Sequence, residues 1–343
     1  GNPLQRDQSA ETEINDVSVN GIENVVIETE DLGADNPDTT SGDDLITGVN
    51  GTVDTFTAAD PIDGKGGTDT IRVLLDANPS NFPTGSLTSI ENFELRELGD
   101  GTMVDFGTIA GEERVVSDRS TSTITAQNLG TDATFVLKGD GSTEFAGTNP
   151  IDYATASDAI NLAFEDGVTI AAAGIDSHID DSGTNTAATT LNITSSGAAN
   201  TVGQLDFSNG DTLTTVNIDA QSDLTINPNT AVPGIDGIAA GTTKIDIDGA
   251  GAVDIDLLDA NVDEVDASGN SGGTTVVLAA AEDKFTGGDG NDTVTLAAGP
   301  TATVDAAGGT GDRLIVNDDA FVDTTAERGN LGGFEILRST EAG

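Results

Sequence analysis

The sequence predicts an all-β protein with little helix, folded as a parallel β-solenoid or β-roll whose turns carry glycine–aspartate loops. A nine-residue glycine–aspartate pattern stands at 287–295, and partial copies lie near both ends of the chain. Short segments that alternate apolar and polar residues recur in pairs through the middle. Threonine, valine, isoleucine and glycine dominate, and these residues are poor helix formers.

The pattern at 287–295 reads Gly-Gly-Asp-Gly-Asn-Asp-Thr-Val-Thr, or G-G-x-G-x-D-x-U-x with an apolar residue at U. Glycine reaches backbone angles closed to other residues, so the loop can turn its carbonyl oxygens inward around a cation. Asp292 adds a carboxylate, and a site made only of oxygen ligands suits a hard ion such as Ca²⁺. Val294 then begins a strand with its side chain toward the core. The segment is therefore interpreted as a calcium loop followed by a strand.

One loop does not complete a calcium site, but similar loops lie at matching distances. Asp283 stands nine residues before Asp292, and Asp312 follows Asp292 by 20 residues, close to two nonapeptides. Because successive loops of a β-roll alternate sides, we expect the loops 287–292 and 308–312 to stack and share one calcium ion. The alternative is that these glycine- and aspartate-rich segments are simply turns.

A second cluster of this kind occupies residues 41–72. Its loops end at Asp44 and Asp69, which we expect to stack, with Asp54 on the opposite side. This cluster matches the pattern less closely, because Lys65 and Thr52 stand where the pattern has glycine.

A strand motif with a glutamate follows each cluster. Glu91 lies 22 residues after Asp69, and Glu335 lies 23 residues after Asp312. The repetition indicates an internal duplication of a loop, a strand, an excursion and a second strand. An earlier copy of the motif at 20–27 lacks its loop, so we expect the chain to be a piece of a longer protein.

The middle of the chain carries a different repeat. Apolar–polar–apolar strands begin at residues 191, 216, 245 and 265, and each has a second member beginning at 205, 224, 253 or 276. This pairing predicts solenoid coils with two strands each. An antiparallel sandwich would also give short alternating strands. Helical turns are expected only at 324–328 and within 144–160.

These patterns divide the chain into four predicted parts. Residues 1–40 form the end of a preceding β module, and residues 41–114 form a calcium-loop β-roll module. Residues 115–280 form the β-solenoid, and residues 281–343 form a second calcium-loop β-roll module.

The charge of the chain restricts its partners. There are 60 acidic and 12 basic residues, which gives a net charge of −48. Nucleic acid and anionic membranes are therefore unfavourable partners, and no apolar run is long enough for membrane insertion. The chain has no cysteine, so bound metal is the obvious substitute for disulfides in a secreted protein.

No catalytic constellation is recognisable, so the sequence favours a protein that is not an enzyme. His178 is the single histidine, and it lies in a polar segment where solvation is its ordinary state. No G-x-S-x-G elbow is present. With 60 acidic residues, pairs of carboxylates close in sequence carry no information about glycosidase chemistry.

Together these features resemble bacterial surface-layer (S-layer) proteins of the RTX class, Caulobacter-like, and related RTX adhesins. The resemblance rests on the nonapeptide at 287–295, supported by 41–72 and 308–316. It implies type I secretion from a Gram-negative bacterium, calcium-dependent folding at the cell surface, and self-assembly into a lattice or filament. The repeats here are isolated rather than in long tandem runs, which suggests single calcium ions used as joints. The calcium ligands that the resemblance implies are Gly287, Asp289, Gly290, Asp292, Gly308, Asp312, Asp44, Gly64, Gly66 and Asp69.

The sequence leaves more than one function open. The first hypothesis is a structural surface protein whose partner is itself, with cell-surface polysaccharide as a further candidate partner. The second is an adhesin that binds carbohydrate, a host surface or ice. The third is a non-catalytic segment of a secreted hydrolase.

Overall fold

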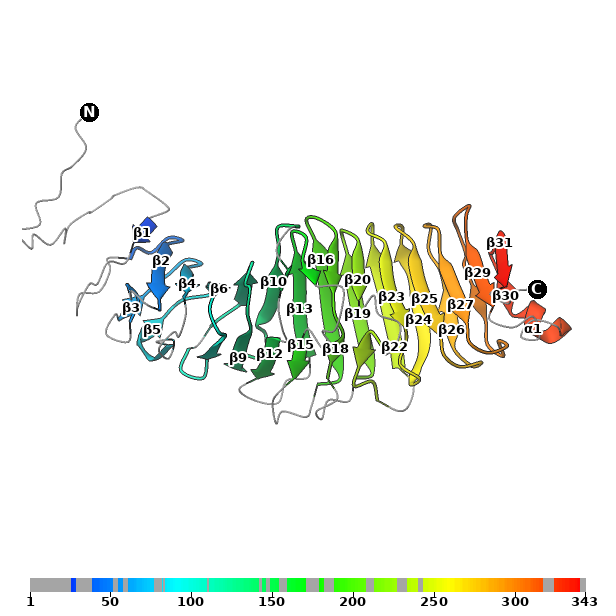
Figure 1. Cartoon of the computed structure of the whole chain (residues 1–343), viewed down its shortest axis with the longest axis horizontal. Coiled ribbons are helices and arrows are strands. Elements are labelled where there is room, and N and C mark those ends of the chain that lie inside the picture. Colours follow the sequence, from blue (N-terminus) through cyan, green and yellow to red (C-terminus); the bar gives the residue numbers. More distant parts are fainter. Residues whose placement is uncertain are drawn as a thin grey trace, which may run out of the picture.

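The computed structural model is a parallel β-solenoid, and in Figure 1 its coils follow one another in chain order along an elongated stack. The structure describes residues 26–28, 39–51, 55–57, 61–76, 82, 84–109, 111–141, 144–145, 149–153, 159–170, 179–181, 188–207, 213–226, 233–239, 243–316 and 324–339. Every strand pair within these ranges is parallel. The predicted solenoid is therefore confirmed, and the antiparallel sandwich is wrong.

One sheet of 14 strands, here called the long sheet, runs through the whole stack. Neighbouring strands in it come from successive coils, so it contains one strand from nearly every coil. At about 4.8 Å per strand it extends roughly 60 Å. Its strands are β1 Val26–Glu28, β2 Leu45–Asn50, β4 Thr70–Leu75, β6 Asn92–Glu97, β8 Arg114–Asp118, β10 Thr134–Lys138, β13 Ala159–Glu165, β16 Thr190–Ser196, β19 Thr215–Ala220, β22 Thr243–Gly249, β24 Val262–Asn270, β26 Lys284–Thr286, β28 Val304–Asp305 and β30 Leu331–Gly332.

The other sides of the coils are formed by shorter sheets. The middle sheet contains β7 Thr102–Asp105, β9 Ile124–Leu129, β12 Asn149–Tyr153, β15 Ile179–Asp181, β18 Leu205–Asp206 and β21 Ile235–Asp236. The C-terminal sheet contains β17 Asn200–Val202, β20 Leu224–Ile226, β23 Val253–Leu257, β25 Thr274–Leu278, β27 Thr293–Leu296, β29 Arg313–Val316 and β31 Ile336–Ser339. Two pairs complete the set: β3 Ile62–Asp63 with β5 Leu87–Thr88, and β11 Glu144–Phe145 with β14 Thr169–Ile170.

The predicted strand pairs are present, but the middle coils differ from the prediction. The strands expected at 191, 216, 245 and 265 are β16, β19, β22 and β24, neighbours in the long sheet. Their second members belong to two different sheets, because β18 lies in the middle sheet while β20, β23 and β25 lie in the C-terminal sheet. The coil that begins with β16 therefore has three strands, not two. The extra strand β17 has only 3 residues, too few to give a recognisable alternation.

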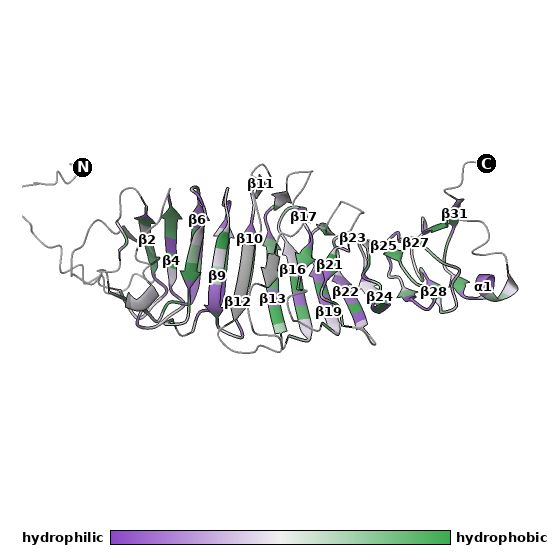
Figure 2. Ribbon diagram, turned by 60° about the horizontal axis from the view of Figure 1, so that its bottom comes forward, coloured by the Kyte–Doolittle hydropathy of each residue, from purple (hydrophilic) through white to green (hydrophobic). Residues whose placement is uncertain are grey.

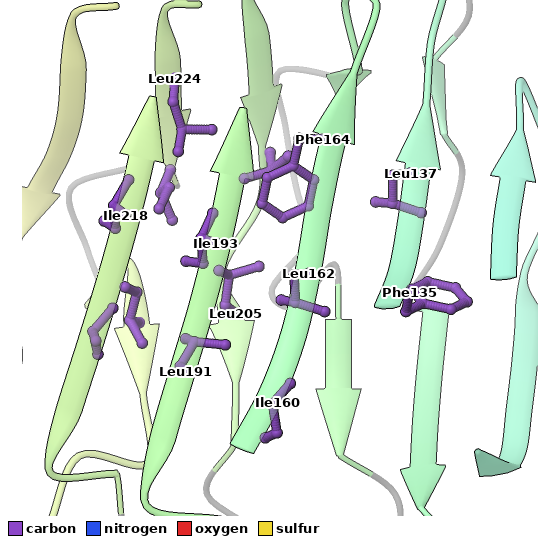
Figure 3. Packing of buried hydrophobic residues seen from close by; sticks show 14 of the residues in the cluster. Phe135, Leu137, Ile160, Leu162, Phe164, Leu191, Ile193, Leu205, Ile218 and Leu224 are labelled. Atoms are coloured by element: carbon purple, nitrogen blue, oxygen red, sulfur yellow. The ribbon is translucent and has the colours of Figure 1, made fainter. Parts of the chain in front are cut away.

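The main core is a column of apolar side chains enclosed by the sheets, and a small separate cluster contains Val116, Val136 and Ala163 of the long sheet. Phe135, Leu162 and Phe164 from the long sheet meet Leu205 and Leu224 from the two facing sheets (Figure 3). Strand alternation produces this arrangement, since apolar positions point inward and polar positions point outward. Figure 2 shows the resulting hydrophobic and hydrophilic bands along strands such as β4 and β22.

Helix in the described ranges is limited to the 3-10 turn η1 Thr84–Ser86, which was not predicted, and to one α-helical turn. Helix α1 spans Thr325–Gly329, as predicted, and Thr324 caps it: the Glu327 N–H donates to Thr324 Oγ1 at 3.1 Å. The helical turn expected within 144–160 is wrong where the structure describes it, because β11, β12 and the start of β13 occupy that segment.

The long sheet continues past residues 114 and 280, where module boundaries were predicted. Those boundaries stay a prediction.

No helix in the described part of the chain has the length and apolar character that crossing a membrane requires.

Candidate functional site

Three acidic residues stack on successive coils near the C-terminal end, and we call them the C-terminal carboxylate ladder: Asp292, Asp312 and Glu335. Each stands directly before a strand of the C-terminal sheet. Asp312 Oδ1 accepts the backbone N–H of Asp292 at 2.7 Å, and Glu335 Oε2 accepts that of Asp312 at 2.9 Å. Asp292 Oδ1 in turn accepts the N–H of Thr274 at 2.7 Å. The expected stacking of Asp292 on Asp312 is confirmed.

The same arrangement occurs near the N-terminal end, in the N-terminal carboxylate ladder of Asp44, Asp69 and Glu91. Asp69 Oδ1 accepts the N–H of Asp44 at 2.8 Å, and Glu91 Oε2 accepts the N–H of Asp69 at 2.7 Å. Asp44 and Asp69 therefore stack as predicted. Lys65, which replaces a glycine of the pattern, has a φ of 69°, so the backbone there does adopt the left-handed conformation that glycine favours.

The two ladders lie on different sheets. The N-terminal ladder precedes β2, β4 and β6 of the long sheet, whereas the C-terminal ladder precedes β27, β29 and β31 of the C-terminal sheet. The duplicated segments thus share their local geometry but differ in which side of the coil carries it.

Two glycines make room for oxygen atoms beside the ladders. A Cβ on Gly64 would lie 1.9 Å from the Ser89 carbonyl oxygen and 2.4 Å from Asp69 Oδ2. A Cβ on Gly287 would lie 2.4 Å from the Ala306 carbonyl oxygen and 2.0 Å from Asp292 Oδ2. Each glycine stands five residues before its aspartate. The spacing therefore brings a carboxylate oxygen and a carbonyl oxygen of the next coil together, twice in one molecule.

Three ladder aspartates, Asp69, Asp292 and Asp312, are held in an environment that disfavours their charge. Asp69 and Asp312 have no measurable exposure, and the Oδ2 atom of each has no hydrogen-bond partner. Burial raises the pKa of Asp69 to about 6, and the charges of Asp44 and Glu91 act in the same direction. Burial, with the charge of Asp312, raises the pKa of Asp292 to about 6. The pKa of Asp312 is raised by burial and by Glu335. A bound cation would offset these penalties.

The other predicted glycines have different surroundings. Gly290 packs on the preceding coil, where a Cβ would lie 2.1 Å from the backbone nitrogen of Gly273. A Cβ on Gly308 would lie 2.9 Å from the Gly288 carbonyl oxygen and 3.0 Å from Asp289 Oδ1. Gly66 is open, with Ser41 O nearest at 4.0 Å. The structure thus gives Gly290 a packing role and leaves Gly66 apart from the ladder.

The remaining predicted acids are not part of the ladders. Asp289 is exposed. Asp283 is buried before β26 of the long sheet, on the side opposite Asp292, and its Oδ2 accepts the Ala280 N–H at 2.8 Å. The predicted alternation of sides is therefore confirmed for Asp283. Asp54 and His178 lie outside the described residues.

Glu91 and Glu335 were not among the predicted site residues, although they complete the two ladders. The signal was present in the matching distances of 22 and 23 residues to the preceding aspartates.

In the middle of the solenoid, buried asparagines cap the backbone of the turns: Asn200 Oδ1 accepts the N–H of Gly167 at 3.0 Å, and Asn270 Oδ1 accepts that of Gly273 at 2.7 Å. A neutral amide therefore satisfies the turn without charge, so capping alone does not explain why the ladders are acidic.

The donors are hard oxygens of the kind that Ca²⁺ takes, and the orphaned Oδ2 atoms fit a cation. Across the described ranges, however, no three His, Cys, Asp or Glu side chains converge as a metal site made of side chains alone would need. Backbone carbonyl oxygens such as those of Ser89 and Ala306 would have to complete the coordination.

Comparison with protein-family models, curated proteins and solved structures gave no match.

Proposed function

We propose that this protein is a calcium-dependent structural protein of the extracellular cell surface that assembles with copies of itself into an S-layer lattice or filament. The observation that carries the proposal is the pair of carboxylate ladders, in which Asp69 and Asp312 are fully buried and each has an Oδ2 atom without a hydrogen-bond partner. The RTX-class resemblance of 287–295 supports the same reading.

Two sets of residues would hold the ion. At the N-terminal ladder these are Asp69 with the Ser89 carbonyl, and at the C-terminal ladder Asp292 and Asp312 with the Ala306 carbonyl. When bound, calcium supplies positive charge to carboxylates that burial and mutual repulsion otherwise penalise. The chain's own part is to fix these oxygens on adjacent coils, so that binding stabilises coil stacking.

Self-assembly follows from the charge of the chain. With a net charge of −48, two copies repel each other at contact, and like charges placed together at an interface cost several kcal/mol. Divalent ions between carboxylates of neighbouring copies convert this repulsion into attraction. The solenoid itself presents long, regular outer faces suited to repeated contacts.

A calcium titration tests the proposal with two readouts. Circular dichroism and melting report folding, while light scattering and electron microscopy report assembly. We expect millimolar calcium to raise the melting temperature and to convert monomers into ordered sheets or filaments, and chelator to reverse both. A chelated protein that melts like the calcium-treated one would refute structural calcium.

One observation favours the adhesin alternative. On the outer face of the C-terminal sheet, Thr201, Thr225, Thr275 and Thr293 occupy one register row, interrupted by Asp254. Such a row could contact an ordered hydroxyl surface such as carbohydrate or ice. A protein that binds calcium, folds and stays monomeric at high concentration, while showing thermal hysteresis or glycan binding, would favour this function.

A further inference from the structure

The outer face of the long sheet carries its charges in two separate halves. Alternate residues of each strand point into the core, so the residues between them form this face. On β4, β6, β8 and β10 the outward residues include four basic and two acidic ones, and we call this region the positive half. On β19, β22, β24 and β26 the outward residues in register include five acidic and two basic ones, and we call this region the negative half. The charged residues of the positive half are Arg72, Arg96, Arg114, Lys138, Glu94 and Asp118, and those of the negative half are Asp219, Asp246, Asp248, Glu264, Asp266, Lys244 and Lys284.

The centre of this face is nearly neutral. It is formed by β13 and β16, which have four strands of the positive half on one side and four strands of the negative half on the other. Asn192 Nδ2 donates to Asn161 Oδ1 at 2.9 Å, and Asn217 Nδ2 donates to Asn192 Oδ1 at 2.8 Å. The outward charge of Glu165 on β13 is paired with Arg114 at 2.7 Å. The two halves therefore lie equally far from the line between β13 and β16.

Both halves have charged groups that a partner can reach. The positive half is hollowed by a groove of about 590 Å³ that Arg72 and Lys138 line. Arg96 forms no ion pair with another described residue, and its Nε has no hydrogen-bond partner. On the negative half, the side chains of Asp219 and Asp248 are exposed. The face thus offers cations on one half and carboxylates on the other, in a chain whose net charge is −48.

We propose that the outer face of the long sheet binds the same face of a second copy of this chain, with the positive half of each copy on the negative half of the other. A two-fold axis parallel to the strands and passing between β13 and β16 produces this arrangement. It reverses the order of the coils, keeps the strand direction and turns the two faces toward each other. A second copy is the occupant that fits, because the two halves are complementary in charge and equally far from the axis. This inference rests on the proposed self-assembly and names one of its contacts.

The face is large enough for a stable pair. Ten strands lie between β4 and β26 inclusive. At about 4.8 Å per strand and roughly 15 Å of strand length they cover about 700 Å² per copy, close to the roughly 800 Å² per partner of a specific interface. A two-fold contact closes on itself and yields pairs, so the other faces of the pair stay available for calcium-bridged contacts.

Two charge-reversal variants of the full chain test the contact. Arg96→Glu with Lys138→Glu makes the positive half acidic, and Asp219→Lys with Asp248→Lys makes the negative half basic. In saturating calcium we expect each variant alone to form particles only at a concentration about tenfold or more above that of wild type, because like charges then face each other. Sedimentation velocity measures this concentration, and melting curves in calcium establish that both variants fold.

An equal mixture of the two variants separates this contact from a general effect of charge. In a mixed pair the reversed half of each copy faces an oppositely charged half of the other, so assembly should return to the wild-type concentration. Net charge alone predicts a different result. The aspartate-to-lysine variant is less negative than wild type, which weakens general repulsion and would promote its self-association.

A single cysteine tests the two-fold axis, because the chain has no cysteine of its own. Thr194 is exposed on β16, beside the line through which the axis passes. Thr194→Cys should therefore cross-link to the same residue of a second copy with a short bifunctional thiol reagent. Met103→Cys is the control, since its side chain is 55% exposed on β7 of the middle sheet and should give few cross-linked pairs.

Three results would overturn the face-to-face contact while leaving self-assembly in place: unchanged assembly of both variants, a mixture that assembles no better than either variant, or no cross-link at Thr194→Cys. Weaker assembly of the Arg96→Glu, Lys138→Glu variant alone would also overturn it, in favour of an acidic polysaccharide on the positive half. A wild-type chain that stays monomeric at all calcium concentrations would overturn both the contact and the proposed self-assembly.

Discussion

Asp312 Oδ1 accepts a hydrogen bond from the backbone N–H of Asp292 across two stacked coils, 20 residues apart in sequence. The bond uses one oxygen of a fully buried carboxylate and leaves Oδ2 without a partner. One oxygen thus has a structural role that requires no metal. The other oxygen is the basis of the calcium proposal, and the two roles can be separated by substitution.

Asp312→Asn should separate capping from metal binding. The amide keeps an oxygen that can accept the Asp292 N–H but removes the negative charge. We expect calcium affinity to fall about tenfold or more, the usual scale for losing a charged ligand contact of about 1.5–3 kcal/mol. Melting in chelator should be unchanged or higher, because one buried charge has been removed. Isothermal titration calorimetry and melting curves provide the two measurements.

The matched control is Asp132→Asn, an exposed aspartate in the turn between β9 and β10. It should change neither calcium affinity nor melting temperature. Equal calcium affinity in Asp312→Asn and wild type would remove Asp312 from the site.

The glycines beside the ladders should not tolerate a methyl group. Gly64→Ala and Gly287→Ala each place a Cβ within 2.4 Å of a carbonyl oxygen and an aspartate Oδ2. We expect each to cost about 1–3 kcal/mol of stability by overpacking and to weaken calcium binding. Gly85→Ala is the control, since nothing lies within 4 Å of its added Cβ. Urea unfolding with and without calcium measures the effect, and tolerance at both ladder glycines would contradict the close convergence of oxygens.

The pH dependence of stability has a definite sign in the absence of metal. The pKa of Asp69 and that of Asp292 are raised to about 6 in the folded protein, above the unfolded value of about 3.9. The folded state therefore binds protons more tightly, and this contribution to stability is full below about pH 4 and lost as pH rises through about 6. The melting temperature of chelated protein should therefore fall as the pH rises from about 4 to about 6.

The comparison that isolates this effect is the double variant Asp69→Asn with Asp292→Asn, which should have a shallower slope of melting temperature against pH. Calcium should restore stability at pH 7 and have a smaller effect toward pH 5, because protons and calcium compete for the same oxygens. Parallel slopes in the variant and wild type would show that these two groups do not control the dependence.

The buried amide of Asn200 should matter more than an amide on the outer face. Its Oδ1 accepts the N–H groups of Gly167 and Val168, and its Nδ2 donates to the Phe164 carbonyl at 3.0 Å. Asn200→Ala should cost about 1–3 kcal/mol for each buried group left unpaired. Asn192→Ala removes only side-chain bonds to Asn161 and Asn217 and should cost about 0.5–1.5 kcal/mol. Chemical denaturation of both variants measures the difference, and equal losses would contradict it.

The sequence was most informative where spacing determined structure. The 20-residue interval from Asp292 to Asp312 predicted stacked coils, and the alternating strands of the middle predicted one face of the solenoid. It was less informative for β17 and β21, because strands of 3 and 2 residues are too short to reveal a period. The sequence also could not predict that the N-terminal ladder lies on the long sheet and the C-terminal ladder on the C-terminal sheet. The local sequence pattern is the same on either side of the coil.

The glutamates of the ladders show a different limit. Glu91 and Glu335 were recognised as repeats but not as site residues, because their motif was interpreted as the start of a strand and not as a calcium loop. Only the three-dimensional register shows that each glutamate accepts the N–H of the aspartate one coil earlier. Spacing to a known site residue is therefore more informative than similarity to the loop itself.

The parallel stacking of coils has a mechanical consequence. Hydrogen bonds between coils run along the solenoid axis, so tension applied to its ends loads the coil–coil interfaces in series, and the weakest opens first. The carboxylate ladders bridge coils near the two ends, where such tension enters. Calcium would then adjust tensile strength, and single-molecule extension in calcium should require more force for the first opening step than extension in chelator. A surface sheet built from such molecules would yield one coil at a time under stress and recover by restacking, which is the behaviour of a tough material rather than a brittle one.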